Sequence, residues 1–187
     1  MARTYSSMMP LGTTAPDFSL PNTRDDAIIR LADARGEKGT LVMFICNHCP
    51  FVLHIADHFA KLNDYIEQGI GVVAISSNDV NHYPDDAPDK MQGFAAAYDF
   101  EFPYLFDESQ DTARAYGAEC TPDFFLFDER LACVYRGRFD ASSPGNAEPI
   151  TGSELFGAMD ALLKGISIEP RQHPSIGCNI KWRMETA

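Results

Sequence analysis

Long apolar segments are scarce in this chain of 187 residues. The first ten residues contain no apolar stretch of the kind found in a secretory signal peptide, and no later run approaches the length of a membrane span. We therefore expect a protein that resides in the cytoplasm and has no membrane partner.

Basic residues are fewer than acidic residues. The chain has 15 lysine and arginine residues against 27 aspartate and glutamate residues, which gives a net charge of −12. Nucleic acids and anionic membranes repel a protein of this charge, so nucleic acid is not an expected partner. A glycine-rich loop of the kind that binds nucleotides is also missing, and we expect no organic cofactor.

Internal repeats, low-complexity tracts and linker-like segments are absent from the sequence. Apolar residues make up 45% of the chain and charged residues 22%, which is ordinary for a soluble globular protein. The length suits one domain with a sizeable core. We expect residues 1–187 to form a single domain.

Cysteine is present, but not in the pattern of a secreted disulfide framework. The chain has five cysteines, an odd number, and two of them, Cys46 and Cys49, are separated by only two residues. They follow the apolar run 40–45 and precede a helical pattern that begins at Phe51. Unpaired N–H groups at a helix start favour thiolate over thiol. The pair can close and reopen a small disulfide, so the spacing predicts a redox site.

Strand and helix patterns alternate along the chain, which predicts an α/β architecture. Continuous apolar runs at 41–45 and 71–77 predict two buried parallel strands, joined through a helix at 51–68. The remaining predicted elements are strands ending near 20 and at 28–31, 102–106, 123–127 and 132–135, and helices at 90–98, 109–116 and 152–163. The last two strands form a hairpin, so we expect a mixed sheet. Ser109 is the expected N-cap of its helix.

The order of these elements resembles the thioredoxin fold, and more narrowly its redoxin branch, which includes peroxiredoxins of the alkyl hydroperoxide reductase and thiol-specific antioxidant type. Segments 15–18 and 120–128 are similar to the N-terminal signature and the proline loop of that branch. Asn47 and His48 between the cysteines, with the tail sequence 177–182, resemble a bacterial subgroup of peroxiredoxin-like proteins. The resemblance implies a central mixed β-sheet flanked by helices, an N-terminal extension, and a C-terminal tail, 165–187, packed on the domain.

The resemblance also implies roles for individual residues. Cys46, nearest the helix start and the more exposed of the pair, would attack a substrate disulfide, and Cys49 would resolve the mixed disulfide. His48 would stabilise the thiolate of the reduced form. The alternative for His48 is a solvated loop position.

A second segment of the redoxin resemblance is Thr121-Pro122. Pro122 matches the fold's cis-proline, which exposes an edge where the backbone of a substrate pairs. A cis bond at Thr121-Pro122 would bring Cys120 near the active site, although a small buried apolar residue is an equally good interpretation of Cys120.

The two other cysteines lie far from the pair in sequence. Cys133 is flanked by apolar residues in a predicted strand, which indicates a core position. Cys178 lies in the tail, four residues before the only tryptophan, Trp182. A tail anchored by Ile180 and Trp182 would present Cys178 as a third redox thiol. A packing tail with an incidental cysteine is the alternative.

Peroxide reduction is the alternative activity. Peroxiredoxins have Thr-x-x-Cys where this chain has Cys46 and Cys49, so Cys49 corresponds to their peroxide-reacting cysteine and Cys46 replaces the threonine. The upstream proline of their motif is missing, and Arg136 and Arg138 lie a few residues too late for the usual arginine. These departures favour disulfide exchange.

Two further classes stay open. Cys46 and Cys49 could bind zinc together with His48, or with His54 and His58 on the following helix. The buried strand before the pair and the proline after it disfavour a structural zinc site, and we expect no metal. The chain could also be a binding module that uses the proline-loop edge and leaves its cysteines unused. The acidic loop that contains Asp85 and Asp86 is expected to be a solvated face.

These observations together predict a thiol-disulfide oxidoreductase with a dithiol-disulfide cycle at Cys46 and Cys49. Its expected partners are protein or small-molecule disulfides, or peroxides, and a dithiol electron donor that restores the reduced form.

Overall fold

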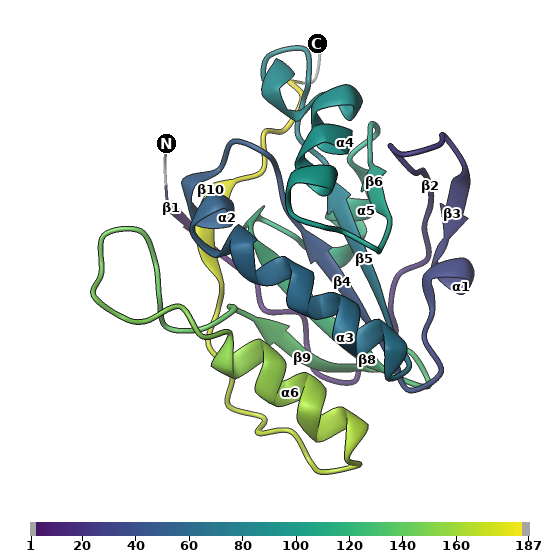
Figure 1. Ribbon diagram of the computed structural model, residues 1–187, viewed down its shortest axis with the longest axis vertical. Coiled ribbons are helices and arrows are strands. Elements are labelled where there is room, and N and C mark those ends of the chain that lie inside the picture. The colour runs from purple at the N-terminus through teal and green to yellow at the C-terminus, as the bar shows by residue number, and fades with distance from the viewer. Residues whose placement is uncertain (1–2, 185–187) are drawn as a thin grey trace.

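The fold is known from a computed structural model that describes residues 3–184. Its largest sheet has five strands in the order β6-β5-β4-β8-β9 (Figure 1). These strands are β4 (Gly39–Phe44), β5 (Ile70–Ser76), β6 (Tyr104–Phe106), β8 (Asp123–Asp128) and β9 (Cys133–Gly137). Strand β4 pairs in parallel with β5, and β5 with β6, whereas β8 pairs antiparallel with both β4 and β9. The expected mixed sheet and late hairpin are therefore confirmed.

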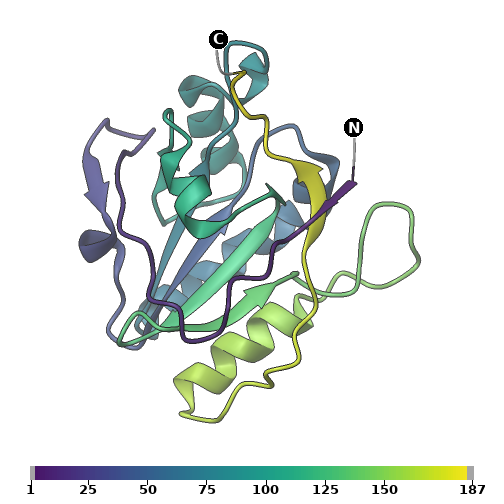
Figure 2. The same ribbon diagram turned by 180° about the vertical axis from the view of Figure 1, so that it is seen from behind.

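Helices cover both faces of this sheet. Helices α2, α3, α4 and α6 lie on the face seen in Figure 1, and α5 lies on the face seen in Figure 2. The helices of the chain are α1 (Leu31–Ala34), α2 (Pro50–Ile55), η1 (Ala56–Lys61), α3 (Leu62–Glu67), η2 (Pro84–Asp86), α4 (Pro88–Ala97), α5 (Asp111–Tyr116) and α6 (Ser153–Leu163). The thioredoxin-like architecture predicted from the sequence is confirmed.

Strand β4 is apolar on both faces from Leu41 to Phe44. Leu41 and Met43 point into the core beneath α2, α3 and α6, while Val42 and Phe44 point into the core on the α5 side. Successive residues of a strand face opposite sides of a sheet, so a strand covered on both faces is apolar at successive positions. The one polar side chain of β4, Thr40, is buried, and its hydroxyl oxygen accepts a hydrogen bond from the backbone N–H of Gly36 at 3.3 Å. The carboxyl end of β4 thus delivers the chain from the centre of the sheet directly to Cys46.

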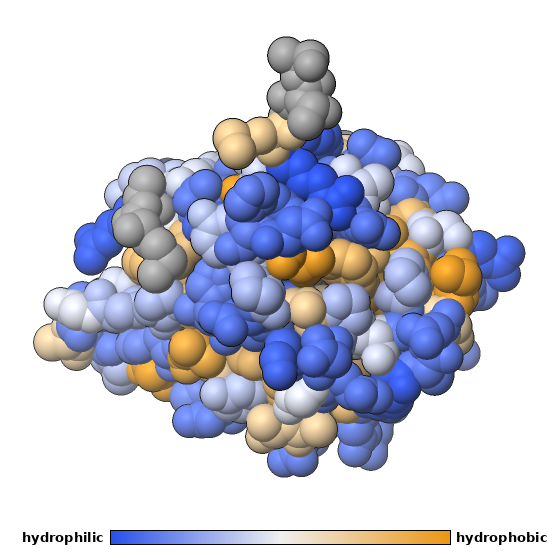
Figure 3. Space-filling view, turned by 90° about the horizontal axis from the view of Figure 1, so that it is seen from above, coloured by the Kyte–Doolittle hydropathy of each residue, from blue (hydrophilic) through white to orange (hydrophobic). Residues whose placement is uncertain are grey.

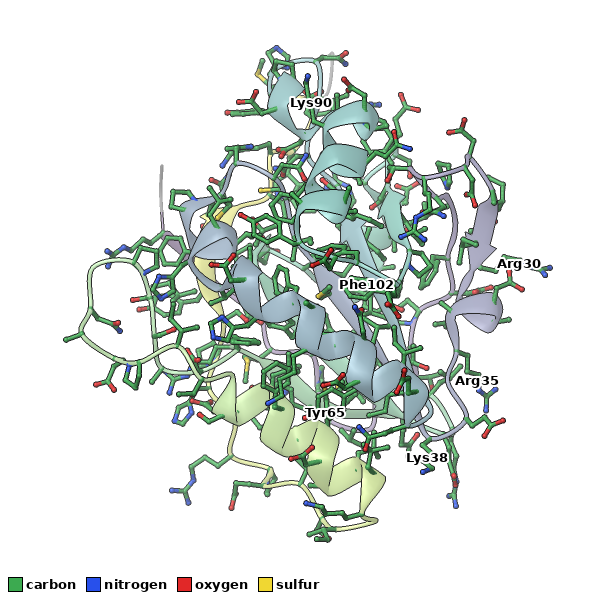
Figure 4. The ribbon with its side chains drawn as sticks, viewed as in Figure 1. Arg30, Arg35, Lys38, Tyr65, Lys90 and Phe102 are labelled. Atoms are coloured by element: carbon green, nitrogen blue, oxygen red, sulfur yellow. The ribbon has the colours of Figure 1, made fainter. Side chains whose placement is uncertain are left out.

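The expected helix at 51–68 is interrupted. Residues Ala56–Lys61 form a 3₁₀ helix between α2 and α3. The sequence contains no glycine or proline there, and the apolar spacing continues through the interruption, with Phe59 and Leu62 fully buried. Near the end of α3, Tyr65, labelled in Figure 4, stacks on Phe156 and donates a hydrogen bond from its hydroxyl group to Asp160 Oδ1 at 2.8 Å, which ties α3 to α6.

Short strands at the chain ends were not predicted. Strand β1 (Arg3–Tyr5) pairs antiparallel with β10 (Ile176–Asn179), and β10 pairs antiparallel with β7 (Cys120–Thr121). Figure 2 shows β1 and β10 side by side next to the main sheet. The hairpin of β2 (Ser19–Pro21) and β3 (Ile28–Arg30) is a separate two-stranded sheet.

The start of α5 differs from expectation. Gln110 is the N-cap residue of α5, and Ser109, expected there, accepts a hydrogen bond from the backbone N–H of Asp111 at 3.2 Å.

No helix within residues 3–184 is long and apolar enough to cross a membrane. The face seen from above is mainly hydrophilic, with small separate apolar patches (Figure 3).

A buried carboxyl group lies at the start of β8. Asp123 is completely buried, and neither of its oxygens has a hydrogen-bond partner. Burial raises the pKa of Asp123 to about 8, although the nearby Ser175 and Ser6 hydroxyls favour the ionised form. Because a carboxyl group in the unfolded chain titrates near its usual value of 3.8, the folded state holds this proton more tightly.

We therefore expect the free energy of unfolding to fall as the pH rises from about 4 to about 8, by an amount on the order of a few kcal/mol from Asp123 alone. Asp123→Asn removes this titration and should flatten the profile, measured by urea unfolding across that range. Asp64→Asn, on the exposed side of α3, is the control and should leave the profile unchanged. A profile as steep in Asp123→Asn as in the parent protein would contradict the assignment.

Candidate functional site

The two cysteines of the motif lie between the end of β4 and the start of α2. Cys49 is the N-cap residue of α2, and Pro50 is its first residue. Cys46 lies three residues earlier, outside the helix. Both side chains are buried, with 1% of Cys46 and none of Cys49 exposed. Cys49, as the N-cap residue, is therefore nearer the helix start than Cys46, contrary to expectation, and burial leaves neither thiol exposed.

Thr121 contacts both sulfur atoms. Its hydroxyl oxygen lies 3.4 Å from Cys46 Sγ, and its carbonyl oxygen accepts a hydrogen bond from Cys49 Sγ at 3.2 Å when that thiol is protonated. The two thiols also hydrogen-bond to each other. The Thr121-Pro122 peptide bond is cis, as the resemblance implied. The proline loop and the cysteine motif thus form one cluster.

The pKa values of the two thiols are shifted in opposite directions. The hydrogen bond from Cys46 lowers the pKa of Cys49 to about 5 against the opposing effect of burial, with further help from Cys178, Thr121 and a backbone N–H of the first turn of α2. The same hydrogen bond raises the pKa of Cys46, and burial and the nearby Asp86 carboxylate add to this rise. These opposite directions favour a negative charge on Cys49, at the helix N-terminus, over one on Cys46.

Asp86 is the functional-site residue that sequence reasoning missed. It was expected on a solvated face but is fully buried. Its carboxylate accepts hydrogen bonds from the backbone N–H of Asn47 at 2.8 Å and from Asn78 Nδ2 at 2.7 Å, and it lies 2.9 Å from His48 Nδ1. A buried charge needs such partners. Its neighbour Asp85 is exposed, so the sequence carries no signal that separates the two aspartates.

His48 is held between two groups. Asp86 raises the pKa of His48, mainly through their direct contact. The imidazole ring also stacks on Tyr83, with ring centroids 5.8 Å apart and an interplanar angle of 5°. His48 is therefore a positioned side chain, and the solvated alternative is wrong.

Asn47 fixes the turn between the cysteines. Besides its backbone contact with Asp86, its side-chain amide donates to the carbonyl oxygen of Asp85 at 2.9 Å. The amide oxygen accepts a hydrogen bond from the Tyr104 hydroxyl at 3.1 Å. These contacts link the motif to the acidic loop and to β6.

Cys120 and Cys178 lie on the paired strands β7 and β10. Cys120 is fully buried, its thiol lies 3.9 Å from the carbonyl oxygen of Pro122, and burial raises its pKa. Cys178 lies opposite Thr121 in the strand ladder and hydrogen-bonds to Cys49. Burial and the contact with Cys49 raise the pKa of Cys178 to about 12. Cys133, expected in the core, is buried in β9 and is 2% exposed.

One group within residues 3–184 has the donor spacing of a metal site. Cys46, His48 and Asp86 each offer one ligand atom, and these atoms lie within 4.8 Å of one another. This set differs from the zinc ligands considered from the sequence: Asp86 replaces Cys49, His54 lies 3.2 Å from Ser142 Oγ, and His58 packs edge-on against Phe139. Contacts with the Asn47 N–H, Asn78 and His48 already stabilise the negative charge of Asp86.

A cavity of about 360 Å³ opens beside this cluster. Phe51 and His54 of α2 form one wall, and Pro122 and Ile176, at the start of β10, form another. The third wall is the loop after Phe139, which projects from the body of the protein in Figure 1. The cavity thus lies between α2, the start of β10 and the segment that precedes this strand.

Comparisons with known proteins agree with the fold described above. A crystal structure of an uncharacterized conserved protein from Geobacillus kaustophilus has 48% identity and a TM-score of 0.97, and the match covers 100% of this chain and 99% of that one. A hypothetical protein from Sinorhizobium meliloti 1021 has 47% identity and a TM-score of 0.93, covering 96% and 98% of the two chains. Peroxidoxin BcpB from Mycobacterium tuberculosis shares the fold, with 22% identity, a TM-score of 0.62 and coverage of 85% and 99%.

Among curated proteins, the sequence has no significant match. The sequence profile of the AhpC/TSA family matches residues 11–136, a segment that includes the cysteine motif, Asp86, Thr121 and Pro122 and makes up more than half of the chain. The chain belongs to the AhpC/TSA family of thioredoxin-fold redoxins.

Proposed function

We propose that the protein is a thiol-disulfide oxidoreductase that cycles between a Cys46/Cys49 dithiol and a disulfide. The observation that carries this proposal is the direct contact of the two thiols at the N-terminus of α2, beside Thr121. Two thiols that already hydrogen-bond need little movement to form a bond between their sulfur atoms.

The charge distribution sets the order of the steps. Cys49, with its lowered pKa, is the thiolate and attacks one sulfur of a substrate disulfide. The other substrate sulfur leaves as a thiol. Cys46 then loses its proton and attacks Cys49 in the mixed disulfide, which releases the second substrate thiol and leaves a Cys46–Cys49 disulfide. This order is the reverse of the one that the resemblance implied.

A dithiol electron donor would return the protein to its reduced state by the same exchange in reverse. The cavity beside Phe51 and Pro122 would take the part of the substrate that flanks the reacting disulfide. Its walls mix aromatic and polar side chains, which suits a peptide better than an ion.

Peroxide reduction is the weaker candidate, because the two arginines considered for it from the sequence are engaged elsewhere. Arg136 donates to the carbonyl oxygen of Met9 at 2.8 Å and to Gln172 Oε1 at 2.7 Å, and Arg138 pairs with Glu154 at 2.6 Å. Both guanidinium groups are thus engaged away from the cluster. The arginine expected beside a peroxide-reacting thiol has no counterpart in either residue.

The order of attack can be tested with a chromogenic aromatic disulfide under single-turnover conditions. Cys49→Ser should slow the reaction at least ~100-fold, whereas Cys46→Ser should still react once, because Cys49 is retained. Cys133→Ser is the control and should match the parent protein. Rapid single turnover in Cys49→Ser together with loss in Cys46→Ser would make Cys46 the nucleophile, and full activity in both would remove the motif from the reaction.

The pH dependence of the same reaction tests the charge on Cys49. A thiol with a pKa of about 5 is already ionised at neutral pH, so the rate of the parent protein should change less than about twofold between about pH 6.5 and 8. A rate that rises about tenfold per pH unit in this range would show that an ordinary thiol attacks.

Asp86→Asn tests the contact that holds His48. Loss of the carboxylate should lower the pKa of His48 toward its usual value, followed by NMR titration of the imidazole Cε1 proton. Because this folded-state pKa is raised, the pair stabilises the fold at pH values below the unfolded pKa of histidine and loses that effect as the pH rises through the folded pKa.

We expect the variant to lose about 2 kcal/mol in the free energy of unfolding at mildly acidic pH, because His48 is partly exposed and solvent weakens its pair with the buried Asp86. Asp85→Asn, one residue away and exposed, is the matched control. An unchanged pKa of His48 in Asp86→Asn would contradict the geometry.

A further inference from the structure

The edge of β7 beside the cysteine motif is covered by the protein's own C-terminal strand. Cys178 lies opposite Thr121 and Asn179 opposite Cys120 in an antiparallel ladder. This is the edge that the resemblance assigned to a substrate backbone. The approach is close: a Cβ atom on Gly177 would lie 2.0 Å from the carbonyl oxygen of Thr121, so only glycine fits there. Substrate pairing at this edge therefore requires that β10 leave it.

Contacts on both sides hold β10 in this position. Before the strand, the backbone N–H of Ser6 donates to the carbonyl oxygen of Ser175 at 2.9 Å. After it, the backbone N–H of Ile180 donates to Glu119 and that of Lys181 to Asn78 Oδ1, at 3.0 and 2.8 Å. The position of Cys178 is thus fixed by the fold rather than by its own thiol.

Cys49 lies between two thiols. It hydrogen-bonds to Cys46 on one side and to Cys178 on the other. The first turn of α2 packs against β10, which brings the N-cap residue of the helix to the strand. The two other cysteines do not share this arrangement, because Cys120 Sγ is directed to the carbonyl oxygen of Pro122 and Cys133 Sγ to that of Tyr135.

We infer that Cys178 exchanges into the motif and forms a second intramolecular disulfide, Cys49–Cys178, which fastens β10 over the substrate edge. The inference rests on the proposed function, which supplies the Cys46–Cys49 disulfide. The Cys178 thiol gives up its proton and attacks Cys49 Sγ, the Cys46–Cys49 bond breaks, and Cys46 leaves with the electron pair and takes up a proton. One disulfide and one thiol become one disulfide and one thiol, so no external oxidant is consumed.

The exchange changes what the protein can bind. In the Cys46–Cys49 form, β10 is held to β7 by two residue pairs of a strand ladder. In the Cys49–Cys178 form, a covalent bond also joins β10 to the start of α2, and an extended substrate can no longer displace the strand. The same bond returns Cys46 to the thiol form. The tail thus acts as a redox-dependent cover of the substrate site.

Peptide mapping of Cys46→Ser tests the inference. The purified variant is treated with one equivalent of diamide, alkylated under denaturing conditions and digested without reductant. We expect a Cys49–Cys178 disulfide within one molecule in more than about half of the protein. The double variant with Cys46→Ser and Cys178→Ala should form no intramolecular disulfide at Cys49. Alkylated Cys49 and Cys178 in the single variant, a link to Cys120 instead, or links only between molecules would overturn the inference.

The parent protein, mapped in parallel, keeps the two proposals apart. If the parent protein forms no Cys46–Cys49 disulfide, the proposed function is contradicted, whichever disulfides are found in Cys46→Ser. A normal Cys46–Cys49 disulfide together with reduced Cys49 and Cys178 in Cys46→Ser would remove only the role of Cys178. Circular dichroism checks that each variant is folded. If Cys46→Ser is not folded, Cys46→Ala is mapped in its place.

Amide hydrogen exchange supplies a readout of the cover itself. Residues 176–180 should exchange at least about tenfold more slowly in oxidised Cys46→Ser than in the same variant after reduction, because the covalent bond suppresses local opening of the strand. Oxidation of the double variant should leave these amides unchanged. Equal exchange in the oxidised and reduced single variant would show that the bond does not close the edge.

Discussion

Thr121 joins the parts of the site that lie far apart in the sequence. Its hydroxyl group contacts Cys46, its carbonyl oxygen contacts Cys49, and its backbone pairs with Cys178. Because Thr121 ends β7 and lies two residues before β8, the register of β8 against β4 sets where these contacts fall. The sulfur atoms therefore occupy positions determined by the central sheet, and a shift of one residue in that pairing would separate the thiols from their common partner.

The asymmetry between Cys46 and Cys49 follows from where charge is buried. Asp86 lies on the Cys46 side, where its negative charge opposes a second anion. The helix start and two neighbouring thiols lie on the Cys49 side, and each stabilises a thiolate. Burial of a carboxylate is unfavourable unless polar groups contact it, and here the Asn47 N–H, Asn78 and His48 surround it. The same carboxylate thus fixes the turn of the motif and directs the negative charge to its second cysteine.

Much of the fold could be predicted because the central strands are apolar on both faces. Such a run leaves few interpretations, and β4 and β5 begin and end within two residues of the predicted bounds. The cysteine motif could be found for a similar reason, since its spacing is local. Asp86 could not be found, because its burial depends on contacts with Asn47 and Asn78 across the site, and nothing in its own neighbourhood distinguishes it from Asp85.

The strands at the two chain ends were missed on other grounds. Strand β10 has four residues, two of them glycine and asparagine, which are uncommon in strands, and it pairs with only two residues of β7. Its stability comes from its neighbours rather than from its own sequence, so no pattern within 176–179 predicts it. The proposed order of attack differs from the one that the resemblance implied, because it follows from the charge of Asp86 and the contacts of Cys49 rather than from the order of the cysteines.

All of the thiols near the motif are buried, with 3% or less of each residue exposed, so a substrate larger than a small molecule cannot reach a sulfur atom without movement of the protein. Strand β10 is the segment that covers the edge of β7 beside the sulfur atoms. Two residue pairs join it to β7, and it belongs to a sheet of three short strands outside the five-stranded sheet. In the proposed mechanism, reactivity and access therefore depend on different parts of the chain: the contacts of Cys49 with its neighbours favour its thiolate, and the C-terminal strand covers the edge beside it.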